Sequence, residues 1–372
     1  MIMQFQIHPK LQQFATFAEF AKDAALGPDD VLFTQRFLYD AFMKDLPCQT
    51  LFYEDYCAGE PSNVMIDAML RAVATMEYKR MIAIGGGTVL DSSKLLNIDG
   101  ATNTEKLFDD PMPPSRSKGL VMIPTTCGTG CEVTGVAVID FPSRGAKIGK
   151  RFECSFADTA VLIGELVKGL PYDFFIYSSV DALIHALEIY VAPTANEYSD
   201  MYCVEAIRKI LTGYNEILKH GPEKRFEMLD SFLIASNMAG IALANVLCGA
   251  VHAMAMHFGS AHHVPHGEAN SRFLMGVFSA YAAKNPDGKL KGVTRLISEC
   301  LGVADDTRTA FAALDAMLRK LLPQKKLTEY GMKREDAAAY ADKVIETQQR
   351  LLVNNYAPLS REDLIAIYEA AN

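Results

Sequence analysis

The hydrophobic periodicity of the chain changes near Lys168, and this change limits the possible folds more than any other feature. Before it, short apolar runs alternate with stretches of helical period. From Pro171 onward nearly every segment has helical period, and strand signals are almost absent. Strands that alternate with helices predict a mainly parallel sheet covered on both faces. We therefore expect an α/β domain over residues 1–168 and an all-helical domain over residues 169–372.

The expected elements of each part follow from the spacing of its apolar residues. An alternation at Met3, Phe5 and Ile7 predicts an N-terminal strand. The other expected strands cover residues 31–34, 48–53, 80–84, 120–123, 137–139 and 160–163, and the expected helices of this part cover residues 62–76 and 88–97. In the second part, helical periods cover residues 172–191, 199–219, 223–257, 269–283, 287–301, 306–321, 334–355 and 361–371.

The charge balance argues against one large class of function. The 372 residues carry a formal net charge of −9, and the isoelectric point is about 5.4. A chain that captures the phosphate backbone of a nucleic acid by electrostatic attraction needs a basic surface instead. We therefore expect no nucleic-acid partner.

Cysteine usage and apolar patterning indicate a soluble protein of the cytoplasm. The eight cysteines are dispersed without a Cys-x-x-Cys pair, which favours free thiols in a reducing compartment. The N-terminus lacks the basic start and long apolar run of a signal peptide. Residues 232–258 carry no charged side chain and are long enough to span a bilayer. They also carry asparagines and histidines, so a buried helix or helix pair fits better, and no membrane partner is expected.

Two glycine-rich turns follow predicted strands, and together they indicate a nucleotide site. One strand runs directly into Gly85-Gly86-Gly87, which opens a helix. Glycines let the backbone approach a phosphate, and a helix N-terminus supplies free N–H donors. A second polar turn, Thr125-Thr126-Cys127-Gly128-Thr129-Gly130, follows the next long apolar strand. Because such turns meet at the carboxyl ends of neighbouring parallel strands, the pair favours a bound nucleotide over plain tight turns.

Histidines are concentrated in one short stretch of the chain. Five of the eight histidines lie between His252 and His266. Imidazole is the commonest protein ligand of transition metals, so the stretch predicts a metal site. Asp181 and His185 are a further candidate pair, because a spacing of four residues in a predicted helix places both side chains on one face.

Three histidines and one aspartate would form a complete ligand set. Asp181, His185, His252 and His266 offer three nitrogens and one oxygen, which suits Fe(II) or Zn(II) and leaves a position open for a substrate oxygen. The inner histidines of the stretch compete for the same roles: His257, His262 and His263. The spacing alone does not rank them.

The motifs resemble those of a known family. The chain is similar along essentially its whole length to the iron-containing (group III) alcohol dehydrogenases. Four segments carry the resemblance: residues 85–94 (GGGTVLDSSK), 124–134 (PTTCGTGCEVT), 181–188 (DALIHALE) and 252–267, which ends in PHG. The resemblance implies an α/β N-terminal dinucleotide-binding domain and an all-α C-terminal metal-binding domain, an architecture related to that of dehydroquinate synthase. It also implies hydride transfer between NAD and an alcohol.

The family's functional residues fall on particular positions of this chain. The metal ligands of the family correspond to Asp181, His185, His252 and His266, and the implied metal is Fe(II) or else Zn(II). The cofactor-binding residues correspond to Gly86, Gly87, Thr88, Thr126 and Thr129, with Lys147 in a poorer flanking pattern. Asp91 belongs to the same motif and is counted with them, although it could serve the loop instead of the ligand.

Two departures from the family pattern leave alternatives open. Many relatives have a histidine four residues after the ligand that corresponds to His252, where this chain has Met256. The candidates for proton transfer or substrate binding are therefore His257, His262 and His263, with Arg272 as a further candidate for a substrate carboxylate. Gln35 stands where many relatives have an aspartate that disfavours a 2′-phosphate. NAD is the expected cofactor, and NADP is the alternative.

Three further stretches indicate the substrate. Residues 177–181 (YSSVD), 263–270 (HVPHGEAN) and 349–356 (QRLLVNNY) are most similar to family members that interconvert 4-hydroxybutyrate and succinate semialdehyde. One alternative is a short diol or simple aldehyde of the 1,3-propanediol or lactaldehyde type, and another is a lyase of the dehydroquinate synthase type. The family also implies a homodimer or a larger homo-oligomer.

Overall fold

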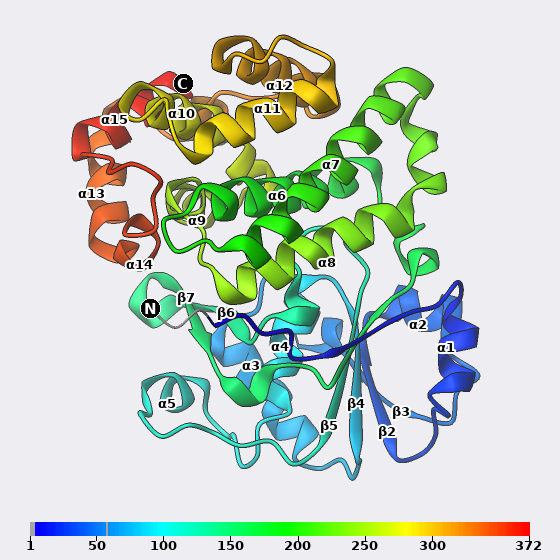
Figure 1. Cartoon of the computed structure of the whole chain (residues 1–372). Helices are drawn as coiled ribbons and strands as arrows, with labels where there is room; N and C mark the ends of the chain where they lie inside the picture. Colours follow the sequence, from blue (N-terminus) through cyan, green and yellow to red (C-terminus); the bar gives the residue numbers. More distant parts are fainter. Residues whose placement is uncertain (1–3, 57–58) are drawn as a thin grey trace. The chain divides into compact units, whose positions relative to one another are not determined.

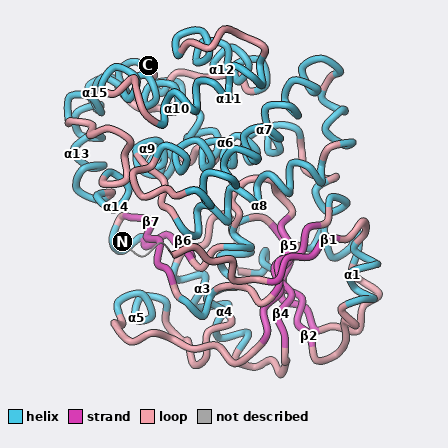
Figure 2. The backbone as a smooth tube through the Cα atoms, viewed as in Figure 1, coloured by secondary structure: helices cyan, strands magenta, loops and turns pink. Residues whose placement is uncertain are grey.

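The computed structural model describes residues 4–56 and 59–372, which form two compact units. One unit covers residues 6–170, and the other covers residues 171–372 together with residues 4 and 5. The first unit is built on a parallel sheet covered by helices, and the second is helical (Figures 1 and 2). The predicted fold class is therefore confirmed.

Six parallel strands form the sheet of the first unit, in the order β1-β8-β5-β4-β2-β3. Pairing of β4 with β5 extends to Gly85 opposite Pro124, so the two strands end side by side. The two glycine-rich turns therefore start from the same edge of the sheet. The strands are β1 (Lys10–Gln13), β2 (Asp30–Thr34), β3 (Gln49–Phe52), β4 (Arg80–Gly85), β5 (Gly119–Pro124) and β8 (Thr159–Leu162).

Helices cover both faces of this sheet. Successive residues of a strand point to opposite faces, and Val31 and Leu32 accordingly join two different hydrophobic cores. One core includes residues of α3 (Asn63–Val73), α4 (Gly87–Leu96) and α5 (Thr104–Asp109). The other includes residues of α1 (Phe17–Asp23) and α2 (Arg36–Phe42). Because both faces are buried, the central strands are continuous apolar runs that the sequence predicts well.

A separate two-stranded sheet pairs β6 (Val136–Phe141) with β7 (Ala146–Arg151) in antiparallel register. The strand predicted over residues 137–139 therefore exists but lies outside the main sheet. The strand β7 was not predicted, because Lys147, Lys150 and Arg151 interrupt its apolar residues and it is only partly buried.

The predicted N-terminal strand is wrong in position. Described residues 4–7 are not in a strand, and the first strand begins at Lys10 beside β8; Met3 lies outside the described residues. Phe5 instead stacks on Tyr198 and Tyr202, with ring centroids 5.5 and 5.7 Å apart. Phe5 thus makes an aromatic contact with the helical unit, and the segment that carries it does not join a sheet.

The helical unit follows the predicted periods closely at its start and less closely later. The bounds of α6 are those predicted, whereas the helix predicted over residues 223–257 is broken into two helices bent by 103°. The helix predicted over residues 334–355 is also broken, at Gln348. The helices are α6 (Tyr172–Val191), α7 (Glu197–His220), α8 (Leu229–Asn245), α9 (Ala250–His262), α10 (His266–Lys284), α11 (Lys289–Leu301), α12 (Thr307–Leu321), α13 (Ala337–Thr347), α14 (Gln349–Leu352) and α15 (Arg361–Ala370).

Gly249 lies at the break between α8 and α9. A Cβ atom there would lie 2.9 Å from Asn355 Oδ1 and 3.2 Å from Glu188 Oε1, so the chain can turn this close to α6 only because the residue is glycine. Apolar residues continue on both sides of the break. Periodicity therefore gives no sign of it.

Among the described residues, one helix, α6, is long and apolar enough to cross a membrane, and the bent pair of α8 and α9 passes the same test together. Inside the protein, however, 78% of the apolar window of α6 is buried. Burial of this extent is typical of the core helix of a globular domain. The uncharged segment 232–258 lies within α8 and α9, in agreement with the prediction of a buried helix pair.

Candidate metal centre and cofactor loops

Helix α6 supplies the first two candidate ligands. Its sequence is apolar for most of its length, so every side chain from Ser179 to Ile189 is buried. Asp181 and His185 lie one turn apart on it and are only 2% and 5% exposed. A buried carboxylate is costly unless a cation compensates its charge.

Glu188, also on α6, positions His252 of α9. One carboxylate oxygen of Glu188 accepts the backbone N–H of Val251 at 2.7 Å, and the other lies 2.6 Å from His252 Nδ1. Because a carboxylate only accepts hydrogen bonds, Nδ1 carries a proton, and Nε2 is the nitrogen left to bind a metal. Glu188 thus selects the tautomer that can bind a metal through Nε2. The sequence motif includes Glu188, but its role depends on the contact with α9.

The ligand atoms of three predicted residues come together around Asp181. Its Oδ1 lies 3.5 Å from His252 Nε2 and 3.7 Å from His266 Nε2. Ligand atoms around a tetrahedral ion with bonds of about 2.1 Å are roughly 3.4 Å apart. The separations therefore fit a single metal ion, and only small side-chain adjustments are needed.

Helix α10 brings His266 to this group because it approaches α6 very closely at Gly267. A Cβ atom at Gly267 would lie 1.9 Å from Tyr177 O, so a larger residue would force the helices apart. One turn after His266, Asn270 donates from Nδ2 to Asp181 Oδ1 at 2.7 Å, and the same amide nitrogen lies 3.1 Å from His266 Nε2. The amide nitrogen therefore bridges the two candidate ligand atoms. The His266 side chain is 40% exposed, which leaves one side of the group accessible.

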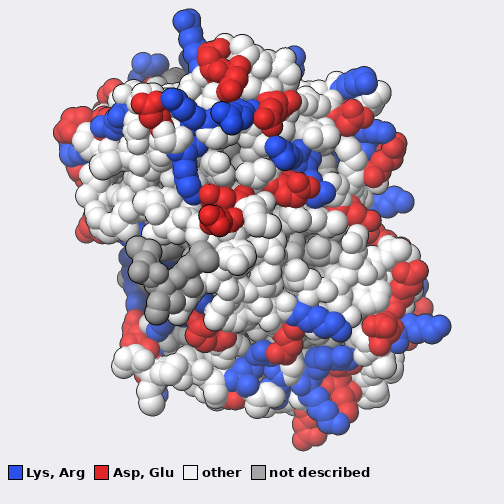
Figure 3. All heavy atoms as spheres, viewed as in Figure 1, with Lys and Arg blue, Asp and Glu red and all other residues white. Residues whose placement is uncertain are grey.

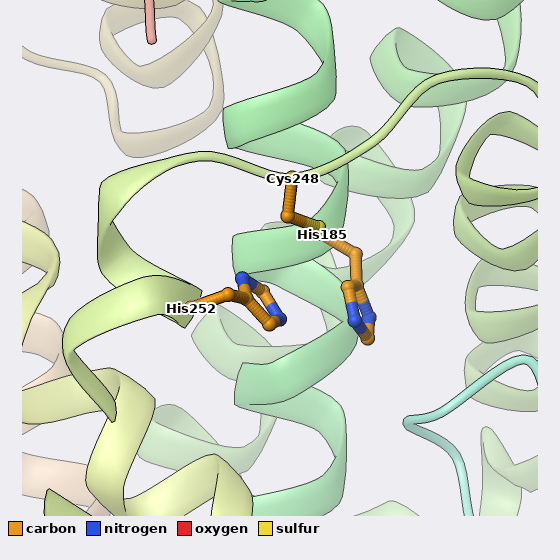
Figure 4. A group of neighbouring side chains, drawn as sticks. All are labelled: His185, Cys248 and His252. Atoms are coloured by element: carbon orange, nitrogen blue, oxygen red, sulfur yellow. The ribbon is translucent and has the colours of Figure 1, made fainter. Parts of the chain in front are cut away.

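His185 joins the group through His252, and Cys248 lies beside both. The two imidazole rings are nearly parallel, with centroids 4.5 Å apart, and the ligand atoms of all three residues lie within 4.8 Å of one another. Figure 4 shows His185 on one helix, His252 on another, and Cys248 on the connecting chain above them. Burial raises the pKa of the Cys248 thiol. Nothing in the sequence singles out Cys248, because an isolated buried cysteine is usually a small core residue.

The charges of this group favour a bound cation. Burial by itself raises the pKa of Asp181, but His185, His266 and His252 outweigh it and hold that pKa below its usual range. Burial by itself lowers the pKa of His252, but Cys248, Asp181 and Glu188 hold that pKa well above the ordinary value. Two buried carboxylates therefore stabilise positive charge here, which a metal ion or a protonated imidazole can supply.

The three inner histidines face a different part of the helical unit. His257 packs on the ring of Tyr340 with centroids 4.7 Å apart, and His262 Nε2 lies 2.7 Å from the Tyr340 hydroxyl. Burial, followed by Lys343 and His262, lowers the pKa of His257, so this imidazole is neutral near pH 7. His263 is exposed and ends α9 in the left-handed conformation, with φ of 54°. Tyr340 thus joins two of these histidines to α13.

The predicted cofactor residues come together at the edge where β4 and β5 end. A Cβ atom on Gly86 would lie 3.3 Å from Thr126 Cγ2, and one on Gly87 would lie 2.9 Å from Thr129 Cγ2. The two turns therefore touch, and larger residues would separate them. Thr88 follows in the first turn of α4, whose N-terminus opens at Gly86. Free N–H donors at this end can hold a phosphate.

Asp91 and Lys147 make contacts within the protein. The Asp91 carboxylate accepts from Lys94 Nζ at 2.9 Å and from the Val138 N–H at 3.1 Å. Fully buried Lys94 also donates to Val136 O at 2.7 Å, so the pair fastens α4 to β6. Lys147 on β7 forms an ion pair with Glu60.

Comparison with known proteins identifies related sequences for both units. Residues 9–163 match the family model for iron-containing alcohol dehydrogenase, and residues 175–372 match the C-terminal model for the Fe-containing alcohol dehydrogenase family. The chain is 44% identical over 366 residues to the 4-hydroxybutyrate dehydrogenase of Clostridium kluyveri, with 98% of each chain covered.

Solved structures share the fold. The chain superimposes on 1,3-propanediol oxidoreductase with a TM-score of 0.85 and 20% identity over 100% of each chain. Its TM-score with the sulfoacetaldehyde reductase from Bifidobacterium kashiwanohense, solved in complex with NAD+, is also 0.85, with 19% identity over 100% of this chain and 98% of that chain. Because the sequence identities are only 20% and 19%, these two comparisons show a shared fold and nothing further.

Proposed function

Because the chain belongs to the iron-containing alcohol dehydrogenase family, we propose that it transfers a hydride between NAD and 4-hydroxybutyrate. Oxidation moves the hydride from the alcohol carbon to NAD+, releases one proton and yields succinate semialdehyde. One observation carries the choice of substrate. The 44% identity with the Clostridium kluyveri 4-hydroxybutyrate dehydrogenase extends over 98% of both chains, so it includes the metal motifs, the cofactor loops and the C-terminal helices alike.

In this proposal Asp181, His185, His252 and His266 hold the metal ion. The support is the spacing of the ligand atoms of Asp181, His252 and His266, the nearness of His185 to His252, and the excess of buried negative charge. A divalent ion held there would polarise the hydroxyl oxygen of the substrate and lower the pKa of the alcohol. Fe(II) is proposed ahead of Zn(II) because the family is iron-containing, although three nitrogens and one oxygen suit both ions.

The chain's own residues prepare the site for this chemistry. Glu188 fixes the tautomer of His252, and Asn270 fixes Asp181 relative to His266. Neutral His257 is the proposed proton carrier among the inner histidines, because burial keeps its pKa low. His262 and His263 are proposed to shape the substrate end of the site.

For the cofactor, Gly86, Gly87, Thr88, Thr126 and Thr129 are proposed to hold the pyrophosphate of NAD. The contact between the two turns and the open N-terminus of α4 support this assignment. Asp91 is proposed to act through the loop, since both of its oxygens already accept hydrogen bonds, and Lys147 is a weaker candidate. NAD is proposed over NADP, although Gln35 places no negative charge against a 2′-phosphate. Residues 1–168 and 169–372 are the proposed domains of a homodimer or larger assembly.

A substrate panel on enzyme reconstituted with Fe(II) tests the proposed function. We expect stoichiometric NADH from 4-hydroxybutyrate and a higher kcat/KM than for the uncharged analogue 1,4-butanediol. His266→Ala should lose metal content and turnover together. A strong preference for the diol would overturn the choice of substrate, and full activity of metal-free His266→Ala would overturn the metal assignment.

A further inference from the structure

Two groups of metal-binding atoms overlap at His252 of α9. Among the residues that the structure describes, one group comprises Asp181, His252 and His266, and the other comprises His185, Cys248 and His252. In each group the ligand atoms lie within 4.8 Å of one another. The first group is open on one side, because the His266 side chain is 40% exposed, whereas every member of the second group is buried. The centre thus offers an ion two positions that share His252, the Asp181 position and the Cys248 position.

His252 Nε2 is the atom that an ion in either position would satisfy. This nitrogen is buried and has no hydrogen-bond partner in the described part of the chain, while Nδ1 of the same ring lies 2.6 Å from Glu188 Oε2. A buried polar atom without a partner is costly unless a ligand or an ion compensates it. Nε and Nη1 of Arg272 are also buried without a partner, but a guanidinium stays protonated and cannot bind a metal.

Cys248 lies on the link between α8 and α9, just before the turn at Gly249. Figure 4 shows its side chain pointing from this link toward the imidazole rings of His185 and His252. A buried thiol is usually an inert packing residue. A metal ion changes this behaviour, because it displaces the thiol proton and binds the thiolate. With two imidazoles beside it, Cys248 therefore has the neighbours that a metal-binding thiolate needs.

The two positions differ in the ions that they favour. The Asp181 position offers one hard carboxylate oxygen with imidazole nitrogens, which suits Fe(II). The Cys248 position offers a soft sulfur with imidazole nitrogens, which favours Zn(II). Charged side chains at the surface offer no comparable choice, since Figure 3 shows acidic and basic groups interspersed over the visible face. The selection between a hard and a soft ion therefore depends on the buried thiol.

We propose that Cys248 gives the centre a second metal position, in which its thiolate, His185 and His252 hold Zn(II) or another soft divalent ion. Binding forms a sulfur–metal bond and releases the thiol proton to water. Because the two positions share His252, an ion held by Cys248 excludes Fe(II) from Asp181 and His266. Zinc therefore displaces iron to a different position and does not simply substitute for it. This inference rests on the proposed metal centre but not on the proposed substrate.

Cd(II) is a suitable probe, because it is a soft ion whose bond to a thiolate gives an ultraviolet charge-transfer band. It is titrated into the metal-free wild type, Cys248→Ser and a matched control, Cys203→Ser. Cys203 is another buried cysteine of the helical unit, on α7, and belongs to neither group of ligands. We expect the band in the wild type and in Cys203→Ser but not in Cys248→Ser. A wild type without the band, or an unchanged band in Cys248→Ser, would overturn the proposal.

X-ray absorption by the zinc-loaded wild type gives a readout that needs no variant. We expect a sulfur atom at about 2.3 Å from the zinc, together with nitrogens at about 2.0–2.1 Å. A shell of nitrogen and oxygen alone would show that zinc takes the Asp181 position and that Cys248 only packs beside it. A wild type that binds no ion stoichiometrically would overturn the proposed metal centre itself.

Competition with a chelator measures the selectivity between the two ions. Loss of an outer partner of a ligand typically weakens metal binding by about 10- to 100-fold, and loss of a ligand should cost no less. We therefore expect Cys248→Ser to weaken Zn(II) binding by at least about thirtyfold and Fe(II) binding by no more than about threefold. Equal losses for both ions would show that Cys248 has only a packing role.

Discussion

Replacing Glu188 with glutamine should weaken metal binding although no metal ligand is removed. The Glu188 carboxylate accepts the N–H groups of Val251 at 2.7 Å and of His252 at 3.4 Å, and it lies 2.6 Å from His252 Nδ1. Glutamine has the same shape but only one acceptor oxygen, and its NH2 group can only donate. When the NH2 group faces Nδ1, the imidazole takes the other tautomer. Nε2 then carries the proton and loses the lone pair that a metal needs.

The size of the effect follows from these contacts. Removing a carboxylate that orients a histidine ligand typically weakens metal binding by about 10- to 100-fold, or roughly 1.4–2.7 kcal/mol. When the NH2 group faces Val251 instead, a buried N–H donor is left unsatisfied at a cost of about 1–3 kcal/mol. Both orientations are costly, so we expect metal affinity to fall by about thirtyfold and the metal-free protein to lose roughly 1–2 kcal/mol.

The assay combines metal content with stability. Wild type and Glu188→Gln are dialysed against graded concentrations of a chelator, their iron or zinc content is measured, and the metal-free proteins are unfolded in urea. Glu268→Gln is the control, since Glu268 is also buried in the helical unit and accepts from the Tyr330 hydroxyl at 2.6 Å. The control should lose stability and keep its metal affinity. Metal affinity of Glu188→Gln within about threefold of wild type would refute the argument that this carboxylate selects the tautomer.

Gly267→Ala should force α10 away from α6, because its Cβ would lie 1.9 Å from Tyr177 O, and metal content after dialysis should drop even though all four ligands remain. Lys94→Met should destabilise the α/β unit by about 3 kcal/mol in urea unfolding, because the Asp91 carboxylate loses the buried cation that donates to it at 2.9 Å; adding Asp91→Asn should recover much of that loss. Arg116→Met should lower the urea midpoint more at pH 6 than at pH 3. Burial raises the pKa of Asp158, but Arg116 and the Leu120 N–H outweigh it and lower that pKa. The stability that the Arg116–Asp158 ion pair contributes is therefore fully present above the unfolded-state pKa of about 3.9, and it is lost as pH falls through the lower folded-state pKa. Because Asp158 is partly exposed, this contribution is limited to about 1 kcal/mol.

Local patterns in the sequence were enough to predict most of the helices and strands. The central strands β2, β4 and β5 are continuous apolar runs because both faces of the sheet are covered, and the run itself predicts them. The helical period over residues 172–191 predicted both ends of α6 correctly. The failures have one common cause. The position of Phe5, the edge pairing of β7 and the turn at Gly249 depend on contacts with residues far away in the sequence.

In the candidate site, too, local spacing predicted some features and long-range contacts decided others. Asp181 and His185 lie one helical turn apart, so their shared face follows from the spacing alone. Which histidines of the cluster join them is a different kind of question, because His252 and His266 lie on two other helices. Residue spacing left that open, and only resemblance to a family ranked the candidates. In the folded chain, His252 Nε2 and His266 Nε2 lie 3.5 and 3.7 Å from Asp181 Oδ1.

The sequence by itself determined the residue types that can bind a metal and a nucleotide, since these depend on composition and on short-range periodicity. Only the tertiary structure decided which supporting groups surround them. Glu188 meets His252 because Gly249 lets α9 turn close to α6, and Asn270 meets Asp181 because Gly267 lets α10 approach it. The end of α14 is tied to the turn before α9 because Asn354 donates to the carbonyl of Leu247. Contacts of this kind join residues 63 to 107 positions apart in the chain, and no local pattern encodes them.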